Sequence, residues 1–330
     1  MPTEASSAAA ICVPMAARWQ FKQNVLRSPI SSGGDPLALT APARRTTLAV
    51  FFTALFVMIL PTLGAIASVF TVISGRAQWL HVAMFVAGFL LTGLGITIGY
   101  HRMLTHRAFE TNGVVKAMLL IFGSMAVEGA ANAWVANHAK HHMHSDREGD
   151  PHSPVHGFIH SHWGWLSEFA SIDTGKYAPW VQEDRVAVWV SKTFPLWVTM
   201  GYVIPFAIAG WEGLVWGGLF RQLAVQNVTF AVNSVCHRWG ARPFNTTDLS
   251  RNNWIVGVLG MGEGWHNNHH AFPVSAFHGL RWWEFDLSGE IIRLMEALKL
   301  IRNVRRPNLQ QIERKLFNPG EAGLYARVTG

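Results

Sequence analysis

The residues of this chain that are best suited to chemistry are histidines, and they occur in clusters. The pattern His-x-x-His-His appears at 138–142 and again at 266–270, and His101 and His106 form a looser pair. Positions i, i+3 and i+4 share one face of a helix, so each His-x-x-His-His is expected to direct three imidazoles towards one point. Imidazole binds iron, copper, zinc and nickel well. Eight ligands exceed the three or four that one zinc ion takes, so the pattern predicts a site for two metals.

Other histidines have plainer interpretations. His81 and His278 are isolated, and we assign them no role. Outer-partner or structural roles are expected for the histidines that crowd the stretch after 142, because ligating histidines need neighbours that orient them. These are His144, His152, His156, His160 and His162.

Acidic residues near the clusters are open to two interpretations. Asp146, Glu148 and Asp150 could orient ligating histidines, or they could simply cap a solvated loop. Glu263 and His266 have the Glu-x-x-His spacing of soluble di-iron bundles, which carry two such motifs. The spacing stands alone here, so we interpret it as chance.

The composition indicates contact with lipid. Of the 330 residues 50% are hydrophobic and only 14% are charged, against about a quarter in soluble domains. The net charge is +7 without a visible nucleic-acid module, which favours an anionic membrane surface or substrate as the partner and not nucleic acid. Cys12 and Cys236 are too far apart in sequence to suggest a disulfide framework, and they predict a reducing compartment.

Four stretches have the ~20 apolar residues that a membrane-spanning helix needs. Short turns join the first to the second and the third to the fourth, which predicts two helical hairpins. A fifth apolar stretch, Val114–Ala136, contains Lys116 and Glu128, and we expect it on the membrane interface. All histidine clusters then follow an even number of crossings and share one face. The four spans are roughly Thr47–Ile73, Leu80–Gly99, Val188–Gly210 and Leu214–Val235.

The basic residues predict which face this is. The loops on the other side hold only Arg76 and Glu212, whereas seven basic residues flank the histidine side. By the positive-inside rule the clusters and both termini are expected in the cytoplasm. The flanking residues are Arg44, Arg45, Arg102, Arg107, Lys140, Arg185 and Lys192.

The predicted fold is therefore an all-α, polytopic membrane protein, with four transmembrane helices in two hairpins and a helical cytoplasmic cap that holds the dimetal site. Residues 1–43 are expected to be a disordered tail without a secretory signal. The four-span domain covers 44–305, its cap consists of 137–186 and 237–305, and 306–330 form a C-terminal tail. Arg221 falls near the middle of the last span, and we expect it to face the bundle or a cavity.

Three segments resemble the histidine boxes of the membrane-bound acyl-lipid and acyl-CoA desaturases, in the bacterial branch similar to stearoyl-CoA desaturase. They are GYHRMLTHRAFE (99–110), WVANHAKHHMHSDREGDPHSP (134–154) and GEGWHNNHHAFP (262–273). The similarity runs from about residue 47 to about 305. It implies two irons held by nine histidines, of which His237, in an Asn-x-x-x-His element, would be the ninth. Asn233 of that element would reach a metal through water. The other eight would be His101, His106, His138, His141, His142, His266, His269 and His270.

The resemblance also implies the reaction. An unactivated methylene offers no acidic proton and no leaving group, so its oxidation needs O₂ activated at a cofactor. The family removes two hydrogens from neighbouring carbons and leaves a cis double bond, most commonly at position nine, and two waters. Long-chain acyl-CoA is the expected substrate, and a glycerolipid acyl chain remains open. Electrons would come from a ferredoxin- or cytochrome-type partner with its reductase.

Substrate-binding residues are less defined. Arg147, Arg238 and Arg242 lie near the boxes and suit the phosphates of CoA, but anionic lipid would explain the same charges. Tunnel-lining candidates with an equally good role as interfacial anchors are Trp134, Trp163 and Trp165.

Two other functions are considered. Membrane fatty-acid or alkane hydroxylases use similar histidine clusters and return oxygen to the carbon. A metal transporter would place ionisable residues along its spans, and the predicted spans hold almost none. The clusters at the span ends therefore favour an enzyme.

Overall fold

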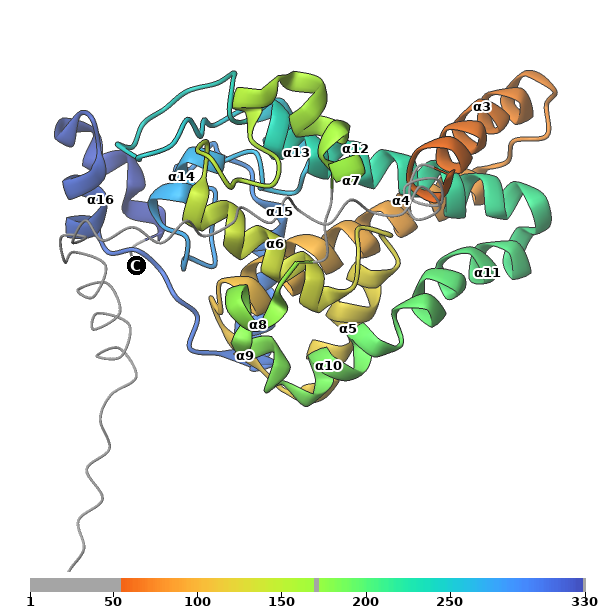
Figure 1. Cartoon of the computed structure of the whole chain (residues 1–330), viewed down its shortest axis with the longest axis horizontal. Coiled ribbons are helices and arrows are strands. Elements are labelled where there is room, and N and C mark those ends of the chain that lie inside the picture. The colour runs from red at the N-terminus through yellow and green to blue at the C-terminus, as the bar shows by residue number, and fades with distance from the viewer. Residues whose placement is uncertain (1–54, 169–171, 329–330) are drawn as a thin grey trace, which may run out of the picture. The chain divides into compact units, whose positions relative to one another are not determined.

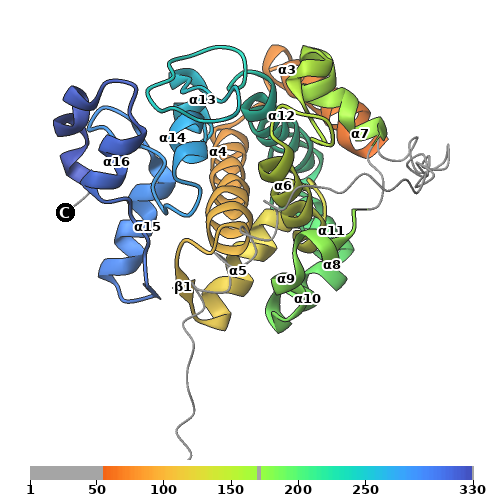
Figure 2. The same cartoon turned by 60° about the vertical axis from the view of Figure 1, so that its left-hand side comes forward.

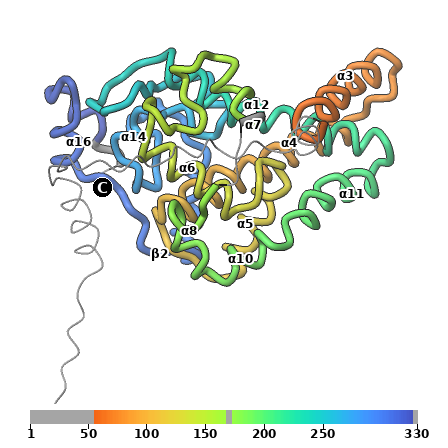
Figure 3. Tube along the Cα trace, viewed as in Figure 1, coloured from red at the N-terminus to blue at the C-terminus, as the bar shows by residue number. Residues whose placement is uncertain are grey.

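The computed structural model describes residues 55–168 and 172–328, and the rest of the chain is drawn in grey in Figures 1 and 3. The predicted tail 1–43 and the predicted start of the first span, 47–54, lie outside the described residues. The prediction of a mainly helical fold is confirmed. Within the described part, the only strands are β1 (Glu110–Thr111) and β2 (Ile301–Arg302), which pair antiparallel with Glu110 opposite Arg302.

Among the residues that the structure describes, three helices are long and apolar enough to cross a membrane. The first joins a π-helical turn, η1, to α3, and the second continues from α4 into the π-helix η2. The third is built from α11, the π-helix η5 and α12. Their bounds are η1 Leu55–Ile59, α3 Leu60–Ile73, α4 Trp79–Leu94, η2 Gly95–Thr105, α11 Phe194–Gly213, η5 Leu214–Phe220 and α12 Arg221–Ser234.

The third helix reverses direction inside its length (Figure 3). Ala209 and Gly210 leave helical geometry, and Gly210 adopts φ +59°, which glycine tolerates without a steric cost. The segments before and after this point lie against each other, since a Cβ at Gly213 would come within 2.1 Å of the Pro205 carbonyl oxygen. The predicted second hairpin turn therefore falls at the observed reversal.

The start of this hairpin differs from the prediction. Val188, the expected first residue of the third span, lies in a separate helix, α10 (Arg185–Lys192). The long helix begins only at Phe194, with Pro195 in its first turn. Proline is well placed there, because the first helical amides have no intrahelical acceptor.

The fifth apolar stretch is divided into two helices, α5 (Gly113–Ser124) and α6 (Ala131–His144). Asn112 caps α5 by accepting from two backbone amides, and Val127 breaks the helix with φ +62°. The twelve residues of α5 extend about 18 Å, which is short of the ~30 Å hydrocarbon core.

The other elements are short helices that surround α14 and α6 (Figure 2). Residues 306–328, expected as part of a tail, pack on these elements and bury Ile312 and Tyr325. The bounds are η3 Pro154–His156, η4 His160–Gly164, α7 Trp165–Glu168, α8 Thr174–Tyr177, α9 Pro179–Gln182, α13 Trp254–Leu259, α14 His266–Ala271, α15 Leu287–Ala297, α16 Leu309–Lys315 and η6 Pro319–Val328.

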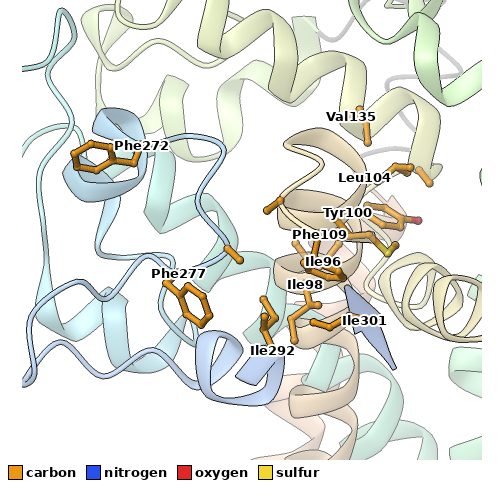
Figure 4. Close-up of a cluster of buried hydrophobic side chains, with 14 of the residues drawn as sticks. Ile96, Ile98, Tyr100, Leu104, Phe109, Val135, Phe272, Phe277, Ile292 and Ile301 are labelled. Carbon is orange, nitrogen blue, oxygen red and sulfur yellow. The ribbon is translucent and has the colours of Figure 1, made fainter. Parts of the chain in front are cut away.

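The buried apolar core joins the second membrane helix to the C-terminal segments. Figure 4 shows Ile98 of η2 beside Ile292 of α15 and Ile301 of β2, and all three are at most 5% exposed. Full burial of such a side chain stabilises a fold by roughly 1.5–3 kcal/mol. This core fixes the first histidine segment against α15 and β2.

Arg221 joins three segments of the chain through backbone carbonyls. It is 1% exposed and donates to the carbonyl oxygens of Gly217, Gly201 and Met125. The expectation that it faces the bundle is confirmed, and carbonyl contacts of this kind are how helix bundles accommodate a buried charge.

A second buried arginine, Arg102, joins the first and third histidine segments. Its guanidinium is fully buried and contacts both carboxylate oxygens of Asp286, at 2.9 and 3.0 Å. It also donates to Glu263 Oε1 at 3.2 Å and to the Ala276 carbonyl at 2.9 Å. A bidentate pair of this kind is geometrically demanding and holds its two segments in one arrangement.

We expect Arg102→Met to lower the free energy of unfolding by roughly 3–5 kcal/mol, because it leaves two buried carboxylates without their cation. Thermal unfolding in detergent would measure the change. Arg302→Met is the matched control, since its ion pair with Glu110 is 77% and 56% exposed and should contribute at most about 1 kcal/mol. Equal losses in both variants would contradict the role given to Arg102.

Candidate metal centre

The first histidine pair is positioned by a π-helix. The amide of His106 donates to the carbonyl of His101 at 3.1 Å, an i to i+5 bond that ends η2. In a regular α-helix the two side chains would lie about 140° apart. The wider π turn instead brings their rings to 4.8 Å between centroids. Such π segments occur frequently at functional sites.

The three histidines of each His-x-x-His-His motif are divided between two groups of imidazoles. The expectation that the three rings of one motif converge on one point is therefore wrong. In α6, His138 and His142 belong to the first group and His141 belongs to the second. In α14, His269 belongs to the first group, and His266 and His270 belong to the second. The reason is geometric, because residues i+3 and i+4 are separated by 100° around a helix. The first histidine group is His101, His106, His138, His142 and His269; the second histidine group is His141, His237, His266 and His270.

Within each group the ligand atoms lie within 4.8 Å of one another. Several Nε2 atoms are much closer: His101 to His269 is 3.1 Å and His142 to His269 is 3.0 Å. In the second histidine group the His237 and His266 Nε2 atoms are 3.0 Å apart. Two nitrogens bound at right angles to one metal, at the ~2.1 Å usual for imidazole, would be separated by about 3.0 Å. These separations are therefore those of ligands that share an ion.

Carboxylates hold the opposite nitrogen of several of these rings. His141 Nδ1 lies 3.0 Å from Asp150, and His237 Nδ1 lies 2.9 Å from Asp146. An outer partner on Nδ1 fixes the ring orientation and leaves Nε2 as the metal-binding atom. Two further contacts of this kind join His270 Nδ1 to Asp248 at 2.8 Å and His101 Nδ1 to Glu263 at 2.5 Å.

The electrostatics favour neutral imidazoles. Burial, followed by the neighbouring histidines, holds the pKa of His266 well below the usual range. Burial lowers the pKa of His270 to about 4 even though Asp248 opposes the shift. Burial alone would raise the pKa of Asp146. The hydrogen bond and charge interaction with His237, the Leu249 amide and His141 together outweigh burial and lower this pKa. Neutral imidazole is the form that binds a metal.

The donor set fits a pair of resident metals. Among the described residues, the Nε2 atoms of His106, His141 and His270 are buried and have no hydrogen-bond partner. A buried polar atom without a partner costs free energy. A cation in the first histidine group would satisfy His106, and a cation in the second would satisfy His141 and His270. All nine histidines named from the sequence lie in one of the two groups.

Two polar residues next to the site, Glu263 and His278, make contacts that the sequence did not predict. Glu263, whose spacing to His266 we interpreted as chance, contacts both His101 and Arg102. His278, which received no role, is fully buried with its ring 4.5 Å from that of His269. The Glu-x-x-His spacing was the available signal for Glu263, whereas a single histidine eight residues beyond a box gives no such signal.

The remaining acidic and histidine candidates are sorted by their contacts. Asp146 and Asp150 do bind site histidines, whereas Glu148 is exposed. His152 packs against His141, with ring centroids 4.4 Å apart. His162 contacts Ser234 and Asn227 on α12 and thereby anchors η4.

An apolar pocket adjoins the two histidine groups. Its polar lining includes His101, His138, His266 and Asn233, and Trp134 alone of the three tryptophan candidates lines it. Trp134 stacks on His138 and donates to Glu128, whose burial raises its pKa to about 8. The apolar lining is Phe89, Ile96, Val225, Val228, Val232, Leu259 and Met261.

The three arginines considered for phosphate binding each contact a backbone carbonyl. Arg238 donates to Pro154 at 2.6 Å and Arg242 to Thr246 at 2.7 Å. Arg147 makes a longer contact of 3.4 Å to Thr247. These bonds fix the loops that carry the outer carboxylates, and they give the arginines a structural role.

Comparison with known proteins places these features in a family. The profile of the fatty acid desaturase family matches residues 77–295. An sn-1 stearoyl-lipid 9-desaturase from Anabaena variabilis is 39% identical, over 74% of this chain and 92% of that protein. An icosanoyl-CoA 5-desaturase from Limnanthes douglasii is 38% identical, over 78% of this chain and 73% of that protein.

A relative with a different product is also similar. A hex-5-enoyl-[acyl-carrier protein] acetylenase from Moorena producens is 34% identical, over 78% of this chain and 87% of that protein. The family match covers the three histidine segments and both histidine groups. The chain therefore belongs to the fatty acid desaturase family and is an oxidoreductase rather than a metal transporter.

Proposed function

We propose that this protein inserts a cis double bond into a saturated long-chain fatty acyl group, at position nine, with O₂ and two electrons at a di-iron site. The observation that carries the proposal is the pair of histidine groups beside an apolar pocket. Position nine is supported by the similarity to the stearoyl-lipid 9-desaturase of Anabaena variabilis. The similarity to a 5-desaturase makes position five the competing outcome.

The nine histidines would bind the two irons, five in the first group and four in the second. Asn233 is the candidate for reaching the second iron through a water, because it lines the pocket four residues before His237. Bound iron would supply the O₂ chemistry that no side chain can perform on a methylene. The carboxylates would keep each ring oriented, and the pocket would hold the acyl chain beside the histidines, an orientation effect.

The chain would cross the membrane four times, as two hairpins. Arg76 and Glu212, in the two hairpin turns, lie 3.5 Å apart, so both turns are at the same end of the bundle. The histidine groups and both termini would then be cytoplasmic, on the side with most of the basic residues. The domain would extend from 44 to 305, with 1–43 as a tail and 306–330 as a C-terminal extension.

The carrier and the electron source follow from the same arrangement. Acyl-CoA and a glycerolipid acyl chain both place an apolar chain in the pocket, and the relatives include proteins named for each. The carbonyl contacts of Arg238 and Arg242 weaken the case for CoA phosphates at those residues. Electrons would come from an external ferredoxin- or cytochrome-type protein and its reductase.

The first test is the fatty-acid profile of a host without its own desaturase. Expression of the chain should produce a cis-monounsaturated acid with its double bond at position nine, located by gas chromatography and mass spectrometry. His269→Ala removes a shared ligand of the first histidine group and should abolish the product. His156→Ala is the control, since His156 is exposed and outside both groups.

Hydroxy acids in place of alkenes would favour the hydroxylase instead. A normal product yield with His269→Ala would contradict the assignment of the metal ligands.

The second test measures metal content. The purified chain should hold two irons, determined by plasma mass spectrometry. Asp248→Asn should weaken iron binding by about 10- to 100-fold, because it replaces the charged acceptor that orients His270 with a neutral amide. Glu148→Gln, at an exposed position, should leave the content at two. Equal retention by both variants during titration with a chelator would argue against the orienting role.

The third test concerns chain length. Five α12 residues line the pocket, from Val225 to Asn233, over about 12 Å of helix. Val225 is farthest along α12 from the histidines, so Val225→Phe should shift the preferred acyl chain to a shorter length by blocking that end. Leu223→Phe, which lies outside the lining, is the control. An unchanged product spectrum would show that the chain does not extend along α12.

A further inference from the structure

The short helix α13 presents an unusually apolar outer surface. Trp254, Ile255, Val258 and Leu259 are 68%, 48%, 46% and 51% exposed. Phe285 is 50% exposed, and its backbone carbonyl accepts from Trp265, whose ring packs against Gly257 of α13. We call these five side chains the α13 surface. None carries a charge, and exposed apolar clusters of this kind mark a contact with a membrane or another protein.

The surface is held rigidly by a residue of the third histidine segment. Trp265 is 6% exposed and lies directly behind α13, since a Cβ at Gly257 would come within 2.9 Å of its ring. Its indole nitrogen donates to the Phe285 carbonyl at 2.8 Å, which brings Phe285 beside the helix. The next residue in the chain is His266, a member of the second histidine group.

The residues that follow α13 contact two of the membrane helices. A Cβ at Gly93 of α4 would come within 2.5 Å of the Met261 Cε. A Cβ at Gly260 would lie 3.4 Å from Val228 of α12. Figures 1 and 2 both draw α13 between α12 and α14. The α13 surface is therefore continuous with the lipid-facing surface of the spans.

The positions of Gly93 on α4 and of Val228 on α12 give the depth of α13 in the bilayer. Trp79, 86% exposed, begins α4 beside the polar turn that holds Arg76, so it marks the far interface. Gly93 stands fourteen residues later, which is about 21 Å along the helix. Val228 stands eighteen residues after the reversal at Gly210, at most about 27 Å. Both values are below the ~30 Å thickness of the hydrocarbon core.

We infer that the α13 surface is immersed in the leaflet of the lipid bilayer that lies on the side of the histidine groups. The helix α13 would lie there in the plane of the membrane, as part of the cap. The depth of its neighbours and its lack of charge favour lipid. A soluble electron donor would instead be recognised through charged groups. Tryptophan and aliphatic side chains are the usual anchors of such interfacial helices.

The immersion has a consequence for the pocket, and this step rests on the proposed desaturase function. Leu259 is exposed on the α13 surface and also lines the pocket. The next two residues, Gly260 and Met261, line the pocket as well. The pocket therefore opens towards lipid at the end of α13. An acyl chain can pass between the bilayer and the histidine groups there without crossing water.

The immersion is tested by quenching in lipid nanodiscs. A polarity-sensitive fluorophore on Val258→Cys, in a Cys12→Ser background, should be quenched by lipids with a nitroxide on the acyl chain at least threefold more than on Leu309→Cys. Leu309 lies on α16, at the end of the domain opposite α3 and α11 (Figure 1). The native Cys236 is fully buried and should not react.

A matched-depth reference is Leu91→Cys, since Leu91 is 45% exposed on α4 two residues from Gly93. Quenching at 258 close to that at 91 supports the inference. Quenching at 258 equal to that at 309 overturns it and assigns the surface to water or a protein partner. Absence of quenching at 91 overturns both the membrane crossing and the inference. None of these readouts depends on desaturase activity.

A larger side chain at the mouth of the pocket tests whether the pocket opens towards lipid. Leu259→Trp should lower product formation from bilayer lipid at least tenfold, because it fills the mouth from the α13 side. Leu294→Trp, on the exposed face of α15, should leave the rate unchanged. Equal rates for both variants would overturn the lipid-side opening. Loss of product in the wild-type chain as well would instead contradict the proposed function and leave the quenching result standing.

Discussion

The constraint on which this structure depends is that nine imidazoles from distant parts of the chain must converge in two groups. Neutral rings do not attract one another strongly enough to hold such an arrangement. The fold supplies the order from outside, through Asp146, Asp150, Asp248 and Glu263, each of which fixes one ring by its Nδ1 atom. Hydrogen bonds and charge interactions with the imidazoles, together with nearby backbone amides, lower the pKa of Asp146, Asp150 and Asp248 although burial opposes the shift.

Arg102 connects this polar shell to the rest of the molecule. It binds Glu263, which holds His101, and it binds Asp286, which accepts from the amides of His278 and Gly289. One guanidinium thus links η2, the third histidine segment and the start of α15. A buried ion pair contributes little net stability compared with apolar packing, but breaking one is costly. Arg102 is better understood as a device that selects one arrangement of three segments.

Much of the site could be predicted from the sequence because its residues occur in short local patterns. The spacing of His138, His141 and His142 indicates a metal site on a helix without any tertiary information. The division of each motif between two groups depends on where the partner helices lie, which spacing alone does not specify. The π-helix at His101 and His106 is also invisible to a period of 3.6, which would place residues five apart on different faces of the helix.

The fold was less predictable where tertiary contacts decide the outcome. Hydrophobicity predicted four apolar spans, and the short join between the last two falls at the observed reversal at Gly210. In the described residues these last two predicted spans belong to one long helix, Phe194–Ser234. The separation of α10 from α11 depends on a local break at Thr193 within an apolar run. Glu263 and His278 show the same limit, because their roles arise from contacts with His101 and His269, more than a hundred residues away in one case and across a turn in the other.

The α13 surface extends this reasoning from the site to the bilayer. Trp265 touches α13 on one side and precedes His266 on the other, so the position of the third histidine segment is tied mechanically to an element at membrane depth. Contact with lipid then stabilises this part of the fold, because water would otherwise be in contact with five large apolar side chains. The indole of Trp265 thus links the third histidine segment to the α13 surface, in addition to the direct link that η2 makes between the second membrane helix and His101.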